Sequence, residues 1–193
     1  MARPAGYIIR LSHFDNSRAW SQHAHDTAQS YQWPVEYFEA TDGRQQTLAD
    51  FGIKIYPDHK KCVKYMQRPG TQGCFVSHWR LWNLCRNQDR PIMIFEHDVE
   101  FLCAPPTQYD FQHVLKFEGF RPSKPIPAGQ WWEGARAYVI TPLGADRILN
   151  WVQANGAMPA DWMLCDGIVD VKFDLDRRVQ VRQNPFSFTR DLQ

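Results

Sequence analysis

The feature that most constrains this chain is a short apolar run that ends in a group of acids. The segment from Ile92 to Phe95 shows no alternation of polar and apolar side chains, and Glu96 and Asp98 follow closely. Such a run is typical of a strand buried on both faces, as in a parallel sheet. Ligands of open α/β sheets bind outside the carboxyl ends of the strands, which is where these acids are expected. A solvated turn after the strand is the alternative, and these residues alone leave both interpretations open.

Glu96 and Asp98 are therefore candidate ligands of a divalent metal ion. Side chains alternate in direction along a strand, so in an extended chain these two carboxylates point one way and His97 points the other. Two carboxylates on one side can share Mg²⁺ or Mn²⁺, because hard cations favour oxygen ligands. His97 is then expected to pack behind the site or to support the ligands.

Hydrophobic patterns elsewhere predict alternating strands and helices, and hence an α/β fold. We expect strands over residues 6–11, 35–40, 92–95, 134–140 and 179–182. We expect helices over residues 18–32, 72–87 and 142–155, with short helical pieces at 111–117 and after Pro159. The expected helix-start residues are Asn16 or Ser17, Thr71, and Thr141 followed by Pro142.

One of these helices carries a histidine and runs directly into the acidic strand. The spacing of its apolar face places on one side Cys74, His78, Leu81, Trp82 and Cys85. A single histidine on an apolar face is more often a hydrogen-bonded core residue than a ligand. Both interpretations stay open for His78.

Composition excludes several classes of function. The net charge of +1 gives no reason to expect a nucleic-acid partner. No apolar stretch is long enough to span a membrane. Five cysteines without a CxxC pair argue against a disulfide framework or a structural zinc site, and they favour a cytoplasmic protein. The length predicts a single domain over residues 1–193, with a proline-rich loop at about 102–130.

Several segments match one family in order along the chain. They are IIRL, FEATDGR, GCFVSHWRLW, IMIFEHDVEF, GARAYVITPLGADRIL and PADWMLCD. Together they resemble glycosyltransferase family 25, the group that contains lipooligosaccharide galactosyltransferases and collagen galactosyltransferase domains. The resemblance spans Tyr7 to about Asn184, and its most specific part is the Gly-Cys…Ser-His…Leu-Trp helix before the acidic strand end.

The resemblance implies a GT-A-like (Rossmann-like), mixed and mostly parallel sheet flanked by helices. It implies a UDP-sugar donor and a divalent metal, Mn²⁺ or Mg²⁺, held by the acidic motif. In this chain that motif falls on Glu96 and Asp98. Asp42 is implied near the nucleoside and Asp161 on the acceptor side. The residues expected around the donor are Asp42, Arg10, His78, Glu96 and His97.

This chain departs from the family pattern at three places. His97 replaces the middle acid of the usual Glu-Asp-Asp, and imidazole is a softer ligand than carboxylate. Arg10 stands where the family commonly has asparagine. No histidine follows His113, so Asp166 or water would have to replace the C-terminal histidine that binds metal in many GT-A enzymes.

The implied reaction moves a hexose, galactose or glucose, from UDP to a saccharide or other hydroxyl acceptor, as in lipopolysaccharide biosynthesis. It inverts the anomeric centre, and it needs a base for the acceptor hydroxyl. Asp161 is the first candidate for that base and Asp166 the second. One alternative is a nucleotide-sugar-binding protein with weak or no turnover. The other is a transferase acting on a modified nucleic-acid base, against which the near-neutral charge argues.

Overall fold

A computed structural model describes residues 3–118 and 134–181 of the chain. The first half contains β1 (Ala5–Arg10), α1 (Asp15–Ser30), β2 (Val35–Glu39), the 3₁₀ helix η1 (Leu48–Phe51), α2 (Lys60–Met66), α3 (Pro69–Gln88) and β3 (Ile92–Glu96). The second half contains β4 (Val99–Phe101), β5 (Val114–Lys116), β6 (Ala137–Ile140), α4 (Pro142–Asn155), α5 (Ala160–Met163), β7 (Val171–Phe173) and β8 (Val179–Val181).

Six strands form one sheet in the order β2-β1-β3-β6-β5-β7. β1 pairs in parallel with both β2 and β3, and β5 pairs in parallel with β7. β6 is antiparallel to both of its neighbours, so it alone runs against the other strands of this sheet. The mixed, mostly parallel α/β fold expected from the sequence is confirmed.

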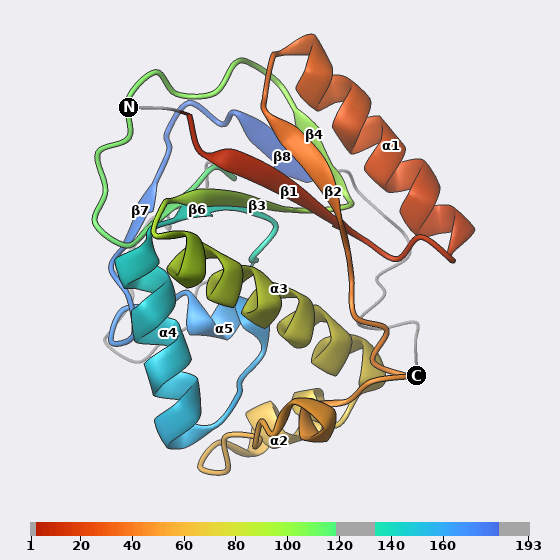
Figure 1. The fold of residues 1–193 in the computed structure, drawn as a ribbon, viewed down its shortest axis with the longest axis vertical. Coiled ribbons are helices and arrows are strands. Elements are labelled where there is room, and N and C mark those ends of the chain that lie inside the picture. Colours follow the sequence, from red (N-terminus) through yellow and green to blue (C-terminus); the bar gives the residue numbers. More distant parts are fainter. Residues whose placement is uncertain (1–2, 119–133, 182–193) are drawn as a thin grey trace.

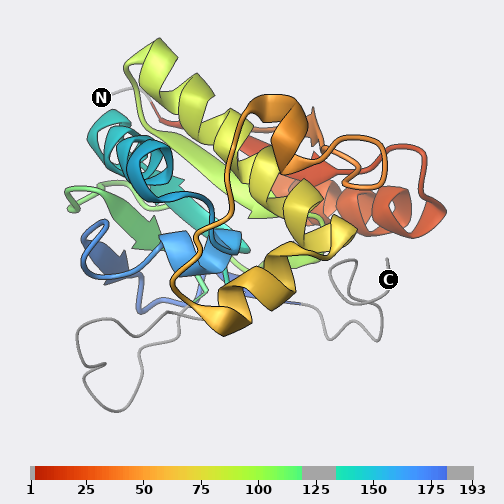
Figure 2. The ribbon, with the colours of Figure 1, turned by 90° about the horizontal axis from the view of Figure 1, so that it is seen from below.

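Helices flank both faces of this sheet (Figures 1 and 2). On one face lie α3, α4 and α5, and on the other lie α1 and the two-stranded β4–β8 sheet. Ile92 and Ile94 of β3 pack with the first group, whereas Met93 and Phe95 pack with the second. This explains why the run carries no polar alternation, because each side of β3 is covered.

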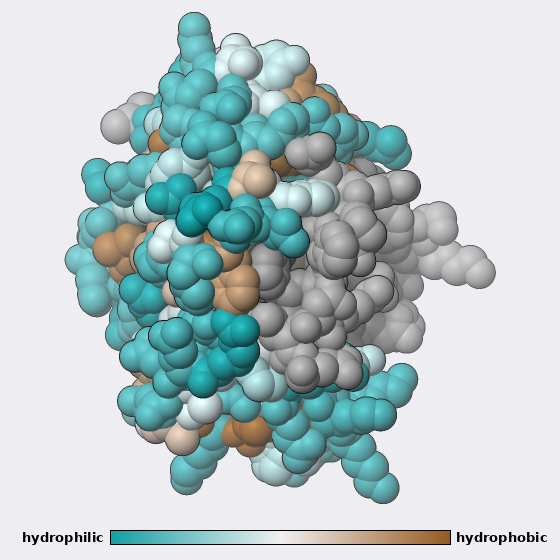
Figure 3. Space-filling model, turned by 90° about the vertical axis from the view of Figure 1, so that its right-hand side faces the viewer, coloured by the Kyte–Doolittle hydropathy of each residue, from teal (hydrophilic) through white to brown (hydrophobic). Residues whose placement is uncertain are grey.

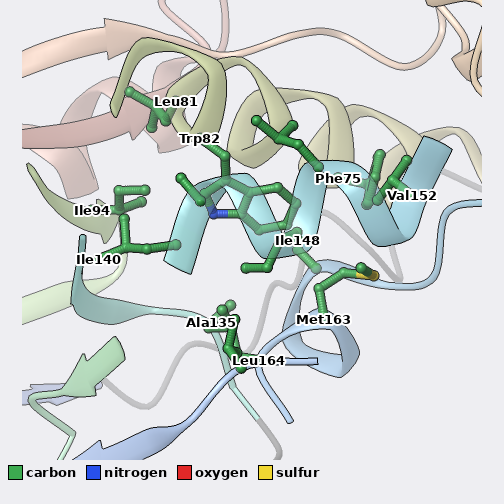
Figure 4. Close-up of a cluster of buried hydrophobic side chains, with 14 of the residues drawn as sticks. Phe75, Leu81, Trp82, Ile94, Ala135, Ile140, Ile148, Val152, Met163 and Leu164 are labelled. Carbon is green, nitrogen blue, oxygen red and sulfur yellow. The ribbon is translucent and has the colours of Figure 1, made fainter. Parts of the chain in front are cut away.

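The core under α3 and α4 is built around a tryptophan (Figure 4). Trp82 of α3 is fully buried among side chains of β3, β6, α4 and the segment at α5. The labelled neighbours are Phe75, Leu81, Ile94, Ala135, Ile140, Ile148, Val152, Met163 and Leu164. Truncating a buried aromatic of this size typically costs about 3–5 kcal/mol. The packing therefore fixes α3, which carries Cys74 and His78, against the end of β3.

Local start and stop signals were confirmed in one helix and were wrong in two. Thr141 caps α4 by accepting a hydrogen bond from the Gly144 backbone N–H at 3.1 Å, and Gly156 ends it with a φ of 104°. Helix α1, however, begins at Asp15 with Phe14 as its cap residue, and α3 begins at Pro69 rather than after Thr71. Proline at the first helical position and an acid in the first turn favour these earlier starts.

The proline-rich region contains a strand that the sequence did not predict. Residues 114–116 form β5 between β6 and β7, so the helical piece expected at 111–117 is wrong. Pairing with partners distant in the chain overrides a short local pattern here. Strands β4 and β7 and the helices η1 and α2 were also missed. Residues 119–130 of the expected loop lie outside the described part of the chain.

Where Figure 3 shows described residues, that molecular face is mostly hydrophilic, with small, separate hydrophobic areas. Among the described residues, the exposed large hydrophobic side chains are spread along the chain: Tyr31, Tyr65, Leu102, Leu143 and Leu175. Within residues 3–118 and 134–181, no helix combines the length and the apolar character needed to cross a membrane.

Candidate active site

The candidate site lies at the edge where the parallel strands end. β1 has β2 on one side and β3 on the other, and the chain reaches β3 only after α3. In open α/β sheets, ligands bind at such a reversal of strand order, outside the carboxyl ends of the strands. Glu96, at the end of β3, pairs with Ile9 near the end of β1. The first acid of the motif therefore stands at the position where this rule places a ligand.

Glu96 is an acid kept ionised by its neighbours. Its Oε1 lies 3.5 Å from His78 Nε2. Burial would raise the pKa of Glu96, but His78, and after it Arg136 and His97, outweigh burial and hold the pKa below its ordinary value. The carboxylate is thus set between a buried imidazole and a guanidinium.

Asp98 lies in a turn between β3 and β4 rather than in an extended strand. The expected alternation of side chains across residues 96–98 is therefore wrong, because the chain leaves the sheet at His97. Asp98 nevertheless interacts with Glu96: burial first, and then the Glu96 charge, raise the pKa of Asp98 to about 7. Its Oδ1 is buried and has no hydrogen-bond partner in the described residues. Burial also lowers the pKa of His97 in the same turn.

His78 fits both interpretations left open by the sequence. Its side chain is fully buried, and Nδ1 lies 2.9 Å from the Tyr138 hydroxyl, which also accepts a hydrogen bond from Trp82 Nε1 at 2.8 Å. It is thus a hydrogen-bonded core residue. Its other nitrogen faces Glu96, so the same ring also borders the candidate site.

Asp161 lies in the first turn of the short helix α5, as expected, and belongs to the same group of charges. Burial, and then the charge of Glu96, raise the pKa of Asp161, although a hydrogen bond from the Gly134 backbone N–H opposes them. Asp166 is exposed in the turn after α5, and its charge acts on the neighbouring Cys165. The structure therefore brings Asp161, but not Asp166, to Glu96.

Three charged residues of this cluster were missed by the sequence analysis. Lys116 is only 1% exposed, and its ammonium donates a hydrogen bond to the Gly134 carbonyl. Glu118 accepts hydrogen bonds from the backbone N–H groups of Arg136 and Ala137 at 2.9 and 3.2 Å. A single charged residue inside an otherwise apolar strand, as in Val-Leu-Lys-Phe and Ala-Arg-Ala-Tyr, is the signal that could have found Lys116 and Arg136.

Asp42 and Arg10 stand at the same sheet edge, but their contacts form a separate group. The carboxylate of Asp42 accepts hydrogen bonds from the side chain and backbone of Arg44 at 2.7–3.1 Å, and His13 Nε2 lies 3.0 Å away. These bonds, led by the Arg44 side chain, lower the pKa of Asp42 strongly. The guanidinium of Arg10 lies 3.7 Å above the Tyr37 ring.

Two glycines join this group to α3. A Cβ added at Gly43 would lie 1.8 Å from the Pro69 carbonyl oxygen, and one at Gly73 would lie 2.5 Å from the Thr41 carbonyl oxygen. Neither backbone contact can admit a side chain. The loop after β2 and the first turn of α3 are therefore in direct backbone contact.

The chemistry of the acid cluster fits a divalent metal ion. Four carboxylates interact there with two basic side chains: Glu96, Asp98, Glu118 and Asp161 with Lys116 and Arg136. Among the described residues, these carboxylates outnumber the two basic side chains, and the buried Oδ1 of Asp98 has no partner. Oxygen ligands with uncompensated charge suit Mg²⁺ or Mn²⁺.

Comparison with known proteins identifies the family. Residues 5–117 match the family model described as "Glycosyltransferase family 25 (LPS biosynthesis protein)". Curated proteins named "Glycosyltransferase 25 family member" are 37% identical over 75 residues in Aedes aegypti and 32% identical over 74 residues in Anopheles gambiae. A third, from Drosophila pseudoobscura pseudoobscura, is 29% identical over 72 residues.

The matches differ in how much of each chain they cover. Each alignment with a curated relative spans 35% of this chain but only 12% of the relative. The family model, in contrast, runs from β1 through α3 and the acidic strand to Phe117, which is more than half of the chain. The match therefore includes β3 and the acids at its end. Because it covers more than half of the chain, the chain belongs to glycosyltransferase family 25.

Proposed function

We propose that the protein transfers a hexose, galactose or glucose, from a UDP-sugar to a hydroxyl group of a saccharide or other acceptor, with inversion. The observation that carries this proposal is the buried oxygen of Asp98, unpartnered among the described residues, near Glu96, whose charge also acts on Asp161. Such an arrangement at the carboxyl ends of the strands is suited to a charged ligand. Membership of a glycosyltransferase family supports sugar transfer as the chemistry.

On the donor side, Asp98 and Glu96 are the proposed metal ligands. A divalent ion there would offset the negative charge that develops on the departing diphosphate. Arg136 is the basic side chain with solvent access, since 42% of it is exposed, and we assign it to the phosphate oxygens. Asp42 acts indirectly in this proposal, because its carboxylate is already occupied by Arg44 and His13, which it would hold towards the nucleoside.

On the acceptor side, Asp161 is the proposed general base. Its carboxylate takes the proton of the acceptor hydroxyl while that oxygen bonds to the anomeric carbon and the bond from carbon to the diphosphate oxygen breaks. A single displacement of this kind inverts the anomeric centre. The raised pKa of Asp161 suits the role, because a base is most effective when its pKa approaches the working pH.

The experiment is a thermal-shift and calorimetric panel of nucleotide sugars, with and without Mn²⁺. A ligand that binds only the native state raises its apparent stability. We expect a UDP-hexose to bind in the presence of Mn²⁺ and to be converted to UDP. Asp98→Asn should abolish the metal-dependent part of this binding. Unchanged Mn²⁺-dependent donor affinity in this variant would show that the metal assignment is wrong.

Asp89→Asn is the matched control, because it makes the same chemical change at an exposed position at the far end of α3. Asn is well tolerated in the left-handed conformation that Asp89 adopts, with a φ of 50°. Its donor binding should equal that of the wild type. Donor binding without UDP formation, with a panel of saccharide acceptors present, would favour the alternative of a binding protein without turnover.

A further inference from the structure

A second set of potential metal ligands adjoins the acidic motif. Cys74 Sγ, a nitrogen of His78 and a carboxylate oxygen of Glu96 all lie within 4.8 Å of one another. Cys74 and His78 are four residues apart on α3 and so project from one helix face. Glu96 reaches them from the end of β3. The donor set thus combines sulfur, nitrogen and oxygen atoms on two packed elements.

The geometry between His78 and Glu96 is closer to that of two metal ligands than to that of a hydrogen bond. His78 Nε2 is buried and lacks a hydrogen-bond partner among the described residues, although Glu96 Oε1 lies 3.5 Å away. An unsatisfied buried nitrogen is costly and calls for an explanation. Two tetrahedral ligands at Zn–N and Zn–O bond lengths are separated by about 3.4 Å. The observed separation matches one edge of such a tetrahedron.

The far side of the imidazole is also arranged as at a metal site. Histidine ligands usually have the second ring nitrogen held by a hydrogen-bond partner, which fixes the orientation of the ring. Here the Tyr138 hydroxyl lies 2.9 Å from Nδ1, and Trp82 donates to the same hydroxyl at 2.8 Å. All three side chains are fully buried. The ring is therefore held with Nε2 towards Glu96.

We propose that Cys74, His78 and Glu96 bind Zn²⁺ or a similar borderline-soft divalent ion. Thiolate and imidazole ligands favour such an ion over Mg²⁺ and Mn²⁺. Three protein ligands leave a fourth position open, as in catalytic zinc sites. The thiol proton is released to solvent when the sulfur bonds to the metal. The sequence argument against zinc considered only CxxC pairs, and this site uses Cys-x₃-His and a remote glutamate instead.

Co²⁺ is the probe, because Co²⁺ bound to a thiolate gives a charge-transfer absorption band in the near ultraviolet. We expect the wild-type protein to show this band with one Co²⁺ bound and to lose it on addition of Zn²⁺. Cys74→Ser should abolish the band and lower Zn²⁺ affinity by at least about tenfold, or about 1.4 kcal/mol. A wild-type protein without the band, or a Cys74→Ser variant that keeps it, overturns the proposal.

Cys85→Ser is the matched control on the same helix. Cys85 is buried and donates towards the carbonyl groups of Arg90 and Ile140, which serine can also do, and it lies outside the donor set. It should keep the Co²⁺ band. Glu96→Gln supplies a second test if Cys74→Ser fails to fold. It should weaken Co²⁺ binding by at least about tenfold while a weaker thiolate band remains, and wild-type Co²⁺ affinity would contradict the site.

This test separates the zinc site from the proposed sugar transfer. Asp98→Asn, which removes a ligand proposed for the donor metal, should retain the Co²⁺ band. A protein that shows the band but neither binds nor hydrolyses a UDP-sugar would refute the transfer proposal alone. A protein that converts UDP-sugar but shows no Cys74-dependent band would refute the zinc site alone.

Discussion

Asp42 and Asp98 follow strands that end at the same edge of the sheet, yet their surroundings differ sharply. Arg44 and His13 occupy the carboxylate of Asp42, and its pKa is lowered. Asp98 is partly buried near Glu96, its buried Oδ1 has no partner in the described residues, and its pKa is raised to about 7. An acid with filled hydrogen-bonding capacity stabilises a loop. An acid with unfilled capacity is available to a ligand.

The difference originates in the neighbours that each sequence segment supplies. Asp42 has a basic partner two residues away, in Arg44. Asp98 has acids two residues away on both sides, and the basic side chain that acts on it, Arg136, comes from the residue just before the distant strand β6. The charges of the acid cluster are therefore brought together by tertiary structure, whereas the Asp42 group is balanced locally.

The largest expected effect concerns Asp161, which belongs to the acid cluster at the end of β3. Asp161→Asn keeps the size of the side chain but cannot accept a proton. Since a general base contributes roughly 10²–10⁴-fold to rate, sugar transfer should fall at least about 100-fold while donor affinity survives. Steady-state transfer rates and donor calorimetry measure the two quantities.

Asp166→Asn is the control for this prediction, because Asp166 is exposed and outside the cluster. Its transfer rate should remain close to that of the wild type. Transfer by Asp161→Asn at a near wild-type rate would remove Asp161 from the chemistry. An Asp161→Asn protein that is unfolded would instead show that the residue serves to start α5.

The next effect contrasts the stabilities of two matched variants. Asp42→Asn loses charge-assisted hydrogen bonds at a buried carboxylate, so the free energy of unfolding should fall by about 1.5–3 kcal/mol. Asp98→Asn removes a buried charge that lacks full compensation, so in the absence of metal it should be neutral or stabilising. Urea unfolding at pH 7 measures both. If Asp98→Asn were less stable than Asp42→Asn, the proposed contrast between the two acids would be wrong.

The pH dependence of stability should show the same contrast in the metal-free protein. The folded-state pKa of Asp98 lies above the ordinary value, so its contribution to stability is present at low pH and is lost as pH rises towards about 7. Asp161 has the same sign. The pKa of Asp42 is lowered, so its contribution is present at neutral pH and is lost only in strong acid.

Unfolding free energies measured between pH 4 and 7 test this contrast. Asp98→Asn should flatten the profile by about 1 kcal/mol, since one pKa unit corresponds to about 1.4 kcal/mol and solvent screens this partly exposed carboxyl. Asp42→Asn should leave the slope in this interval unchanged. If the free energy of unfolding of Asp98→Asn keeps the wild-type slope against pH, groups other than Asp98 cause that slope.

The smallest expected effect is that of His97→Asp, which restores the usual acid of the family motif. His97 lies in the turn with Asp98, where burial lowers its pKa. We expect it to support the site without direct contact with the metal or donor, so transfer should stay within about tenfold of the wild type, or below about 1.4 kcal/mol. A larger gain or loss would show that His97 contacts the metal or the donor directly.

The sequence predicted elements whose signals are local. The apolar run of β3 and the Thr-Pro start of α4 were each confirmed, because burial on both faces and capping depend on neighbouring residues. The strand β5 was not predicted, because its three residues are held by β6 and β7, whose pairing partners lie more than twenty residues away.

For the candidate site, too, some residues were identified from the sequence and others were missed. Glu96, Asp98 and Asp161 were identified from an acidic strand end and a family resemblance, and the structure places them in one cluster. The extended geometry expected for residues 96–98 was wrong, because the chain turns where β4 must pack on the other face. Lys116 and Arg136 were missed, because only the pairing of β5 with β6 brings them to the acids.

The backbone contact at Gly43 and Gly73 has a consequence for how the protein can vary. With Pro69 and Thr41 backbone atoms closer than any Cβ can approach, neither position accepts even alanine without moving α3. Because α3 also carries Cys74 and His78, a change in the loop that holds Asp42 would displace groups close to Glu96. The two halves of the site are therefore expected to evolve together, with the spacing between them fixed by main chain.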